Sequence, residues 1–221
     1  MECAFRHVRI SPIASIQTEM SSPTSKMAAQ RQDWDTAESR CAERRELAGA
    51  AASAAVAVEE GVTVRFRPIG RTDVDAADRW TFGGYAPGWL WSRELTRARR
   101  RPRRVEAAVY AELPNHTHVL CGLILGRISN RHVVASIHLL SRAPAPNPLQ
   151  GRFAKIAVRY LEFCAAAFDC TTASLQRPIP ELVDFYKSLG YSRVVEKKGK
   201  IERLERDLGA VLSAMRKGDQ P

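Results

Sequence analysis

The stretch RHVVASIHLLSRAPAPNPLQGRFAKIAVRYLEFCAAAFDCTTASLQRPIPELVDFYKSLGY, residues 131–191, decides the fold. It opens with an apolar, β-branched run from His132 to Leu140, which is typical of a central strand. After a proline-containing loop, apolar residues recur every three or four positions from Phe153 to Phe168, which predicts an amphipathic helix packed on a sheet. Thr172 to Gln176 predicts a short strand, and Pro180 suits the first turn of a second helix. The stretch therefore predicts a strand, loop, helix, strand, helix unit.

The loop Asn147-Pro148-Leu149-Gln150-Gly151-Arg152 lies directly before the predicted long helix. Backbone N–H groups at a helix N-terminus are unpaired, and the helix dipole adds partial positive charge there. Gly151 permits close approach to the backbone and Arg152 adds a formal charge. We expect the loop to hold a phosphate-bearing ligand. The alternative is a proline-rich connection that a glycine caps.

The sequence before this unit predicts a strand, two helices and two further strands. Three neighbouring strands joined by short turns imply antiparallel pairing. The predicted elements are a strand at Val62 to Phe66, a helix capped by Thr72 or Asp73 and running through Trp80, a helix at Trp89 to Arg100, and strands at Val105 to Ala111 and Val119 to Ile128. After the unit, Ser192 to Glu196 and Lys200 to Arg206 predict a hairpin, although Ile201 to Arg216 also fits a helix.

The two ends of the chain differ from its centre in composition. Residues 1–26 are rich in Ser and Thr and predict disorder, while residues 27–60 are Ala-rich and predict a loosely attached helix. We expect an extension at residues 1–60, a domain at 61–208 and a tail at 209–221. For the extension, a partner-binding or secretion-related role, a plain tail and a start at Met27 all remain open.

Composition places the chain among ordinary globular proteins. Hydrophobic residues make up 45% and charged residues 26% of the sequence, which excludes a wholly disordered chain. The five cysteines are odd in number and form no Cys-x-x-Cys pair, so neither a disulfide framework nor a zinc ribbon is predicted. No stretch is long and apolar enough for a membrane span, and no secretory signal is present. We expect a cytoplasmic protein.

The formal net charge is +10, which favours anionic ligands or partners. Much of this charge lies in two clusters, and each is either a solvated helix end or turn, or an anion site. The larger cluster holds Arg93, Arg97, Arg99, Arg100, Arg101, Arg103 and Arg104, and the smaller one holds Lys197, Lys198 and Lys200.

The order of predicted elements, from about Val62 to Arg206, resembles the GNAT superfamily of acyl-CoA-dependent N-acyltransferases. The segment from Leu182 to Tyr191, with Phe185-Tyr186 and Leu189-Gly190-Tyr191, is similar to a characteristic helix of that family. The resemblance implies an α/β (α+β) fold with a mixed, mainly antiparallel sheet flanked by helices, and acetyl-CoA (acyl-CoA) as cofactor. It implies that the cofactor is bound by Leu139, Leu140, Arg142, Gln150, Gly151, Arg152, Phe153 and Ala154, in a loop that is longer and richer in proline than the family's usual one.

The same resemblance implies that Tyr186 lies near the CoA sulfur and protonates the leaving thiolate, which a phenol can do. The alternative is that Tyr186 is a core aromatic residue. The candidates for a general base are Glu112, His116, His118 and His138, and we select Glu112 and His138. His116 and His118 with Cys121 give weak metal geometry, so we predict no metal site.

Three functions are compatible with the sequence. The leading one is an enzyme, an N-acyltransferase that moves an acetyl (acyl) group to an amine. The second is a catalytically inactive GNAT-fold binding module whose Arg93 to Arg104 cluster contacts nucleic acid or an acidic partner. The third, an effector or interaction protein that depends on residues 1–60, rests on composition alone. The sequence favours a CoA thioester and an amine as partners and no membrane.

Overall fold

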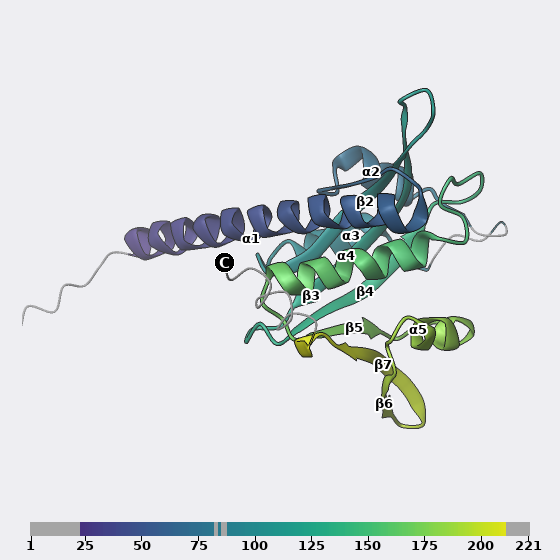
Figure 1. The fold of residues 1–221 in the computed structure, drawn as a ribbon. Helices are drawn as coiled ribbons and strands as arrows, with labels where there is room; N and C mark the ends of the chain where they lie inside the picture. Colours follow the sequence, from purple (N-terminus) through teal and green to yellow (C-terminus); the bar gives the residue numbers. More distant parts are fainter. Residues whose placement is uncertain (1–22, 82–83, 85–87, 211–221) are drawn as a thin grey trace, which may run out of the picture.

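The protein folds around one seven-stranded sheet with helices on both faces (Figure 1). The computed structural model describes residues 23–81, 84 and 88–210. The strands are β1 (Val64–Arg67), β2 (Arg104–Glu112), β3 (His118–Ile128), β4 (Val134–Arg142), β5 (Thr172–Gln176), β6 (Arg193–Lys197) and β7 (Lys200–Asp207). The helices are α1 (Pro23–Glu60), α2 (Arg71–Ala77), α3 (Trp91–Ala98), α4 (Phe153–Ala167) and α5 (Val183–Ser188), with the short 3₁₀ helix η1 (Pro180–Leu182) before α5.

The strand order across the sheet is β1-β2-β3-β4-β5-β7-β6. Strands β1 to β4 pair antiparallel, β4 and β5 pair parallel, and β7 pairs antiparallel with both β5 and β6. The parallel pair exists because the chain crosses over through α4 between its two strands. The expected fold, a mixed and mainly antiparallel sheet flanked by helices, is confirmed. Its element order is the one that the resemblance to the GNAT superfamily implied.

Most element boundaries lie within a few residues of those predicted. The strand β5 has the predicted bounds, and the C-terminal region forms the hairpin of β6 and β7 and not the alternative helix. Neither Thr72 nor Asp73 caps α2: the helix begins after Gly70, whose N–H donates to Asp73 Oδ2 at 2.7 Å. The predicted capping position is therefore wrong by two or three residues, because Asp73 lies inside the first turn of the helix and accepts the hydrogen bond of the Gly70 N–H from there.

Helix α1 is longer and better packed than the sequence predicts. It begins at Pro23, so the predicted disorder is wrong for residues 23–26, while residues 1–22 and 211–221 lie outside the described residues. The helix continues through Gly49, where the missing side chain lets it pass close to Phe66 of β1. Its residues Ala48, Ala52 and Val56 are buried. The helix is therefore part of the core and is not loosely attached.

Two apolar cores lie on opposite faces of the sheet. On one face, α1 and α4 lie side by side (Figure 1), and the rings of Phe66 and Tyr160 stack with centroids 4.6 Å apart beneath them. On the other face, α2 and α3 cover a smaller core that contains Trp91 and Leu95. Because both faces are covered, ligands reach the sheet where its strands part or at its edges.

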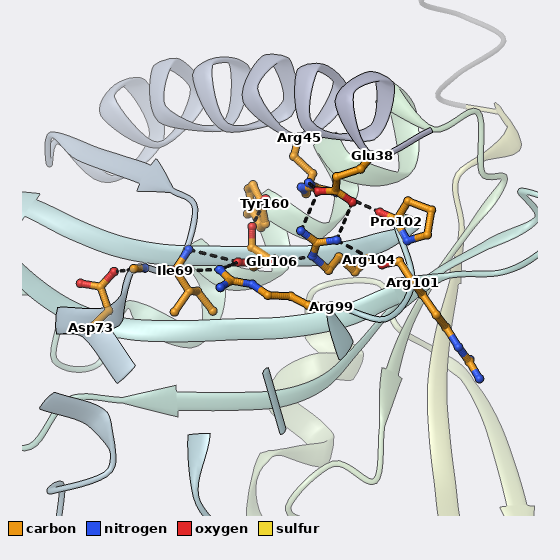
Figure 2. A network of polar contacts seen from close by, with 11 residues as sticks. Glu38, Arg45, Ile69, Asp73, Arg99, Arg101, Pro102, Arg104, Glu106 and Tyr160 are labelled. Atoms are coloured by element: carbon orange, nitrogen blue, oxygen red, sulfur yellow. Dashed lines mark hydrogen bonds and ion pairs between the residues drawn. The ribbon is translucent and has the colours of Figure 1, made fainter. Parts of the chain in front are cut away.

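A buried network of charges ties α1 to the sheet (Figure 2). The carboxylate of Glu106 on β2 pairs with Arg99 at 2.7 Å and with Arg104. Arg104 also donates two hydrogen bonds, of 2.6 and 2.7 Å, to the carboxylate of Glu38 on α1, which Arg45 contacts at 2.6 Å. Burial raises the pKa of Glu106, but the hydrogen bonds and charges of Arg99 and Arg104 outweigh it and hold that pKa below its usual range.

Candidate functional site

The parallel strands β4 and β5 pair at one end and part at the other. Val134 to Ile137 pair with Thr172 to Leu175 in register. Beyond this point, within the part of the chain that the structure describes, the segment from His138 to Arg142 has no strand partner on the β5 side. The divergence leaves one edge of β4 open in the middle of the sheet, and it leads towards the N-terminus of α4.

A β-bulge at His138 marks the start of the divergence. Leu125 on β3 pairs with Leu139, and the next residue, Gly126, pairs with Ile137, so His138 is an extra residue on β4. A bulge bends its strand and increases the local twist. Gly126 permits the close approach of the two strands here, since a Cβ at this position would lie 1.8 Å from the carbonyl oxygen of Ser136.

The backbone of β4 presents polar groups to the open edge. The N–H of Ala143 donates to the carbonyl of Cys121 on β3 at 2.8 Å. Alternate residues of a strand point their N–H groups in opposite directions, so those of Ser141 and Leu139 also point to β3. The N–H groups of Leu140 and Arg142 therefore point into the space between β4 and β5.

The loop after β4 is held by Asn147, which is buried. Its amide nitrogen donates to the carbonyls of Cys121 and Ala143 at 2.8 and 3.0 Å, and its amide oxygen accepts from the N–H of Leu149 at 2.9 Å. Leu149 is fully buried beneath the loop. The sequence predicts the loop but not this role of Asn147. The available signal was an asparagine between two prolines, because asparagine side chains often hydrogen-bond to the backbone of their own turn.

The N-terminus of α4 has unpaired backbone donors, as the sequence predicts. The N–H groups of Arg152 and Phe153 both donate to Leu149 within the loop. In contrast, those of Gly151, Ala154 and Lys155 have no backbone acceptor among the described residues. Three donors beside the positive end of the helix dipole suit a phosphate group.

Side chains of the predicted phosphate loop divide into two groups. Gln150, Gly151 and Arg152 are exposed, but Phe153 is buried in the core, so only its backbone can face a ligand. The guanidinium of Arg152 donates to the carbonyl of Glu60 at the end of α1 at 3.1 Å. Lys155, one helical turn further on, forms an ion pair with the carboxylate of Glu60. The end of α1 therefore lies against the basic side chains of this loop, a contact that no pattern in the sequence predicts.

Tyr186 combines a buried ring with an accessible hydroxyl. The residue is 5% exposed, and burial raises its pKa. Its hydroxyl forms no hydrogen bond with any described residue. The hydroxyl of Tyr191 is unpaired and fully enclosed, whereas that of Tyr186 is unpaired but not fully enclosed. The Tyr186 hydroxyl therefore keeps contact with solvent, as a proton donor at a site needs. Its aromatic ring packs in the core, as the alternative interpretation expects. Its role as an acid stays a prediction.

His138 stands on the bulge, and its Nε2 lies 3.0 Å from the hydroxyl of Ser136. The residue is exposed, but enough of the protein surrounds its imidazole to desolvate it in part. Desolvation by burial, with smaller effects of the positive charges of Arg127 and Arg177, lowers the pKa of His138 to about 4. The imidazole is thus neutral at physiological pH. It can accept a hydrogen bond from an amine, but such a weak base gives little driving force for removing a proton from an ammonium ion.

Glu112 and His138 do not lie together. Across the sheet, Glu106 of β2 is level with the bulge, because it pairs with Leu125 of β3, which in turn pairs with Leu139 of β4. Glu112 lies six residues further along β2. That places Glu112 roughly 20 Å from the bulge along the strand direction. Glu112 instead accepts a hydrogen bond from His116 at 3.0 Å, and this bond, the largest cause, holds its pKa below the usual range. Its predicted catalytic role has no geometric support.

The arginine cluster is largely part of the fold. Arg97 pairs with Glu94 at 3.0 Å, and Arg103 donates to the carbonyl of Asn130 at 2.7 Å. Arg99 and Arg104 belong to the network around Glu106. Of the seven arginines of the cluster, three are therefore ion-paired within the protein and a fourth donates to a backbone carbonyl. Within the described residues, no group of three or more His, Cys, Asp or Glu side chains could hold a metal ion, and no helix is long and apolar enough to cross a bilayer.

Several solved structures have a similar fold at low sequence identity. A domain from Methanocaldococcus jannaschii is 15% identical with a TM-score of 0.48, and 66% of this chain and 99% of that chain are covered. A chimera of spermidine N-acetyltransferase SpeG from Vibrio cholerae and hSSAT is 17% identical with a TM-score of 0.47, covering 67% and 98%. The PaiA N-acetyltransferase from Thermoplasma acidophilum, in complex with coenzyme A, is 17% identical with a TM-score of 0.45, covering 66% and 99%. No protein-family model and no curated protein matches the sequence.

Proposed function

We propose that the protein is an N-acyltransferase that uses acetyl-CoA, or another acyl-CoA, to acylate an amine. The observation that carries this proposal is the divergence of β4 from β5 at the His138 bulge, which leads directly to the open N-terminus of α4. An extended ligand with a phosphate group at one end and a polar chain behind it fits this arrangement. The pyrophosphate takes the donors of Gly151, Ala154 and Lys155, and the pantetheine arm runs along the open edge of β4.

The reaction needs three contributions from the protein. The N–H of Leu140 donates to the thioester carbonyl and stabilises the negative charge that develops there. The amine nitrogen forms a bond to the carbonyl carbon and loses its proton to solvent water, and the carbon–sulfur bond breaks. Tyr186 gives its proton to the departing thiolate and regains one from solvent. His138, which is neutral, accepts a hydrogen bond from the incoming amine and orients it.

Isothermal titration calorimetry with acetyl-CoA tests the proposal. We expect saturable binding that weakens about tenfold in Gly151→Ala, because the added methyl group lies where the phosphates dock and removes one hydrogen bond. Gly84→Ala is the matched control. Both glycines have a positive φ, +78° and +85°, and among the described residues neither has an atom within 4 Å of an added Cβ, but Gly84 lies outside the loop.

The wild-type titration decides the outcome. Absence of any binding at millimolar acetyl-CoA would exclude this cofactor and with it the proposed reaction. Equal weakening in both glycine variants would show that backbone strain, and not the phosphate loop, is responsible.

A further inference from the structure

A large open cavity lies between the β5–α5 connection, α5 and the hairpin of β6 and β7. Its volume is about 1070 Å³, which is enough for a ligand larger than one amino acid. Four basic side chains, Arg177, Lys197, Lys198 and Lys200, line this cavity, which we call the hairpin cavity. The acidic residues on its lining are Asp184 and Glu202.

The basic side chains of the hairpin cavity have no acidic partner among the described residues. Within the described part of the chain, none of the four forms an ion pair with an acidic side chain. Basic residues nearby do: Arg193 and Arg203 pair with Glu205, and Arg206 pairs with Glu162. Of the two acidic residues on the lining, Asp184 is already paired with Lys187 at 3.8 Å. With four basic side chains against Asp184 and Glu202, the lining of the cavity therefore carries a net positive charge.

The hairpin cavity adjoins the point where β4 and β5 part. The last pair between these strands is Ile137 with Leu175, and Arg177 follows Leu175 by two residues, a distance of roughly 7 Å. The charge of Arg177 also acts on the ring of His138, since it contributes to the low pKa of that histidine. Arg177 is thus shared between the edge of the hairpin cavity and the surroundings of the bulge. A molecule bound in the cavity has a route to the open edge of β4.

We propose that the hairpin cavity binds the acceptor, and that the acceptor is an amine carrying one or more negative groups, carboxylate or phosphate. This inference rests on the proposed acyl transfer and adds the chemical class of its second substrate. Four unpaired cations attract such groups at short range, and the net charge of +10 attracts them at long range. A polyamine would instead bring several positive charges next to these cations, which costs free energy.

The test compares amine acceptors of different charge. The probes are the C-terminally amidated dipeptides Glu-Glu, Gln-Gln and Lys-Lys, which share a free α-amine and lack a terminal carboxylate, together with O-phosphoserine and spermidine. Release of CoA thiol from acetyl-CoA gives kcat/KM for each. We expect Glu-Glu or O-phosphoserine to exceed Gln-Gln by at least tenfold, and Lys-Lys and spermidine to be the poorest. The better of the two anionic probes identifies carboxylate or phosphate as the preferred group.

A charge-reversed variant ties the preference to the cavity. Lys198→Glu combined with Lys200→Glu should reduce kcat/KM for the anionic probes at least tenfold, through KM, while the Kd of acetyl-CoA stays within twofold. The matched control is Arg31→Glu combined with Arg40→Glu, which reverses two exposed charges on α1, a helix that Figure 1 shows apart from the hairpin. Melting curves confirm that the variants fold.

The outcomes separate this inference from the proposed function. Wild-type protein that binds acetyl-CoA but acetylates Lys-Lys or spermidine as well as the anionic probes, or acetylates none of the anionic probes, overturns the acceptor class and leaves the cofactor site standing. A charge-reversed variant that loses affinity for acetyl-CoA assigns the cavity to the cofactor and also overturns it. Failure of the wild type to bind acetyl-CoA removes the proposed function itself.

Discussion

Tyr186 is the residue whose structure most directly matches a chemical role. Its ring is fixed in the core and its hydroxyl reaches solvent, so Tyr186→Phe removes one atom without creating a cavity. If the hydroxyl protonates the leaving thiolate, kcat should fall by about 10²-fold or more while the Kd of acetyl-CoA is unchanged. Stopped-assay kinetics and calorimetry on the same preparation measure both quantities. A variant with wild-type kcat would leave Tyr186 as a core aromatic residue only.

His138 makes a prediction about stability and pH. Its pKa of about 4 in the folded protein lies below the usual value of about 6.5 for an unfolded chain. The unfolded state therefore binds more protons between these values, and the free energy of unfolding rises as the pH increases from about 4 to 6.5. His138→Gln, which keeps a hydrogen-bonding group near Ser136, should flatten this rise. Urea unfolding across the pH range measures it, and identical slopes for the two proteins would refute the prediction.

At the scale of elements, the attachment of α1 to β2 depends on charges that are largely shielded from solvent. The side chains of Glu106 and Arg104 are 2% and 9% exposed. Glu106→Ala leaves Arg104 buried with only part of its partners, and breaking a buried pair in this way costs about 3–5 kcal/mol. The free energy of unfolding from urea titration should fall by that amount.

An exposed pair on α3 provides the control for this substitution. Glu94 pairs with Arg97, whose side chain is 61% exposed, and exposed pairs contribute less than about 1 kcal/mol. Glu94→Ala should therefore be nearly neutral. Equal losses in both variants would show that burial of the network around Glu106 has no special effect.

The elements that the sequence predicts well are those with strong local signals. The apolar runs of β2 and β3 with the turn residues between them, and the threefold and fourfold spacing of α4, define those elements without help from the rest of the chain. The bulge at His138 has no such signal, because it depends on the register between two strands and on the backbone contact at Gly126. The same is true of the hairpin cavity: its lysines appear in the sequence as a charged turn, and only the fold brings Arg177 beside them.

At the scale of the whole molecule, the main difference between sequence and structure concerns α1. Its composition, rich in alanine with few large apolar residues, indicates a helix but gives no large anchors from which to infer packing. The structure shows that small residues are what this position requires, since Ala48 and Ala52 are 2% and 0% exposed between α1 and its neighbours. The charged contact from Glu38 to Arg104 joins residues 66 positions apart. No local pattern reports such a contact.

The position of α1 leads to a prediction about where the chain can be shortened. Figure 1 shows the N-terminal part of α1 extending beyond the sheet, and the first buried residue of the helix is Cys41. Removal of residues 1–36 keeps Glu38 and every buried position of α1, so the melting temperature should change by no more than about 2 °C.

Removal of residues 1–60 exposes Phe66 and Tyr160 and leaves Arg104 without Glu38. Several kcal/mol are lost, which corresponds to a decrease of at least about 10 °C. Scanning calorimetry of both truncated proteins measures this difference. A stable, monomeric protein lacking residues 1–60 would mean that α1 is an appendage and that the sheet with α4 is sufficient for the fold.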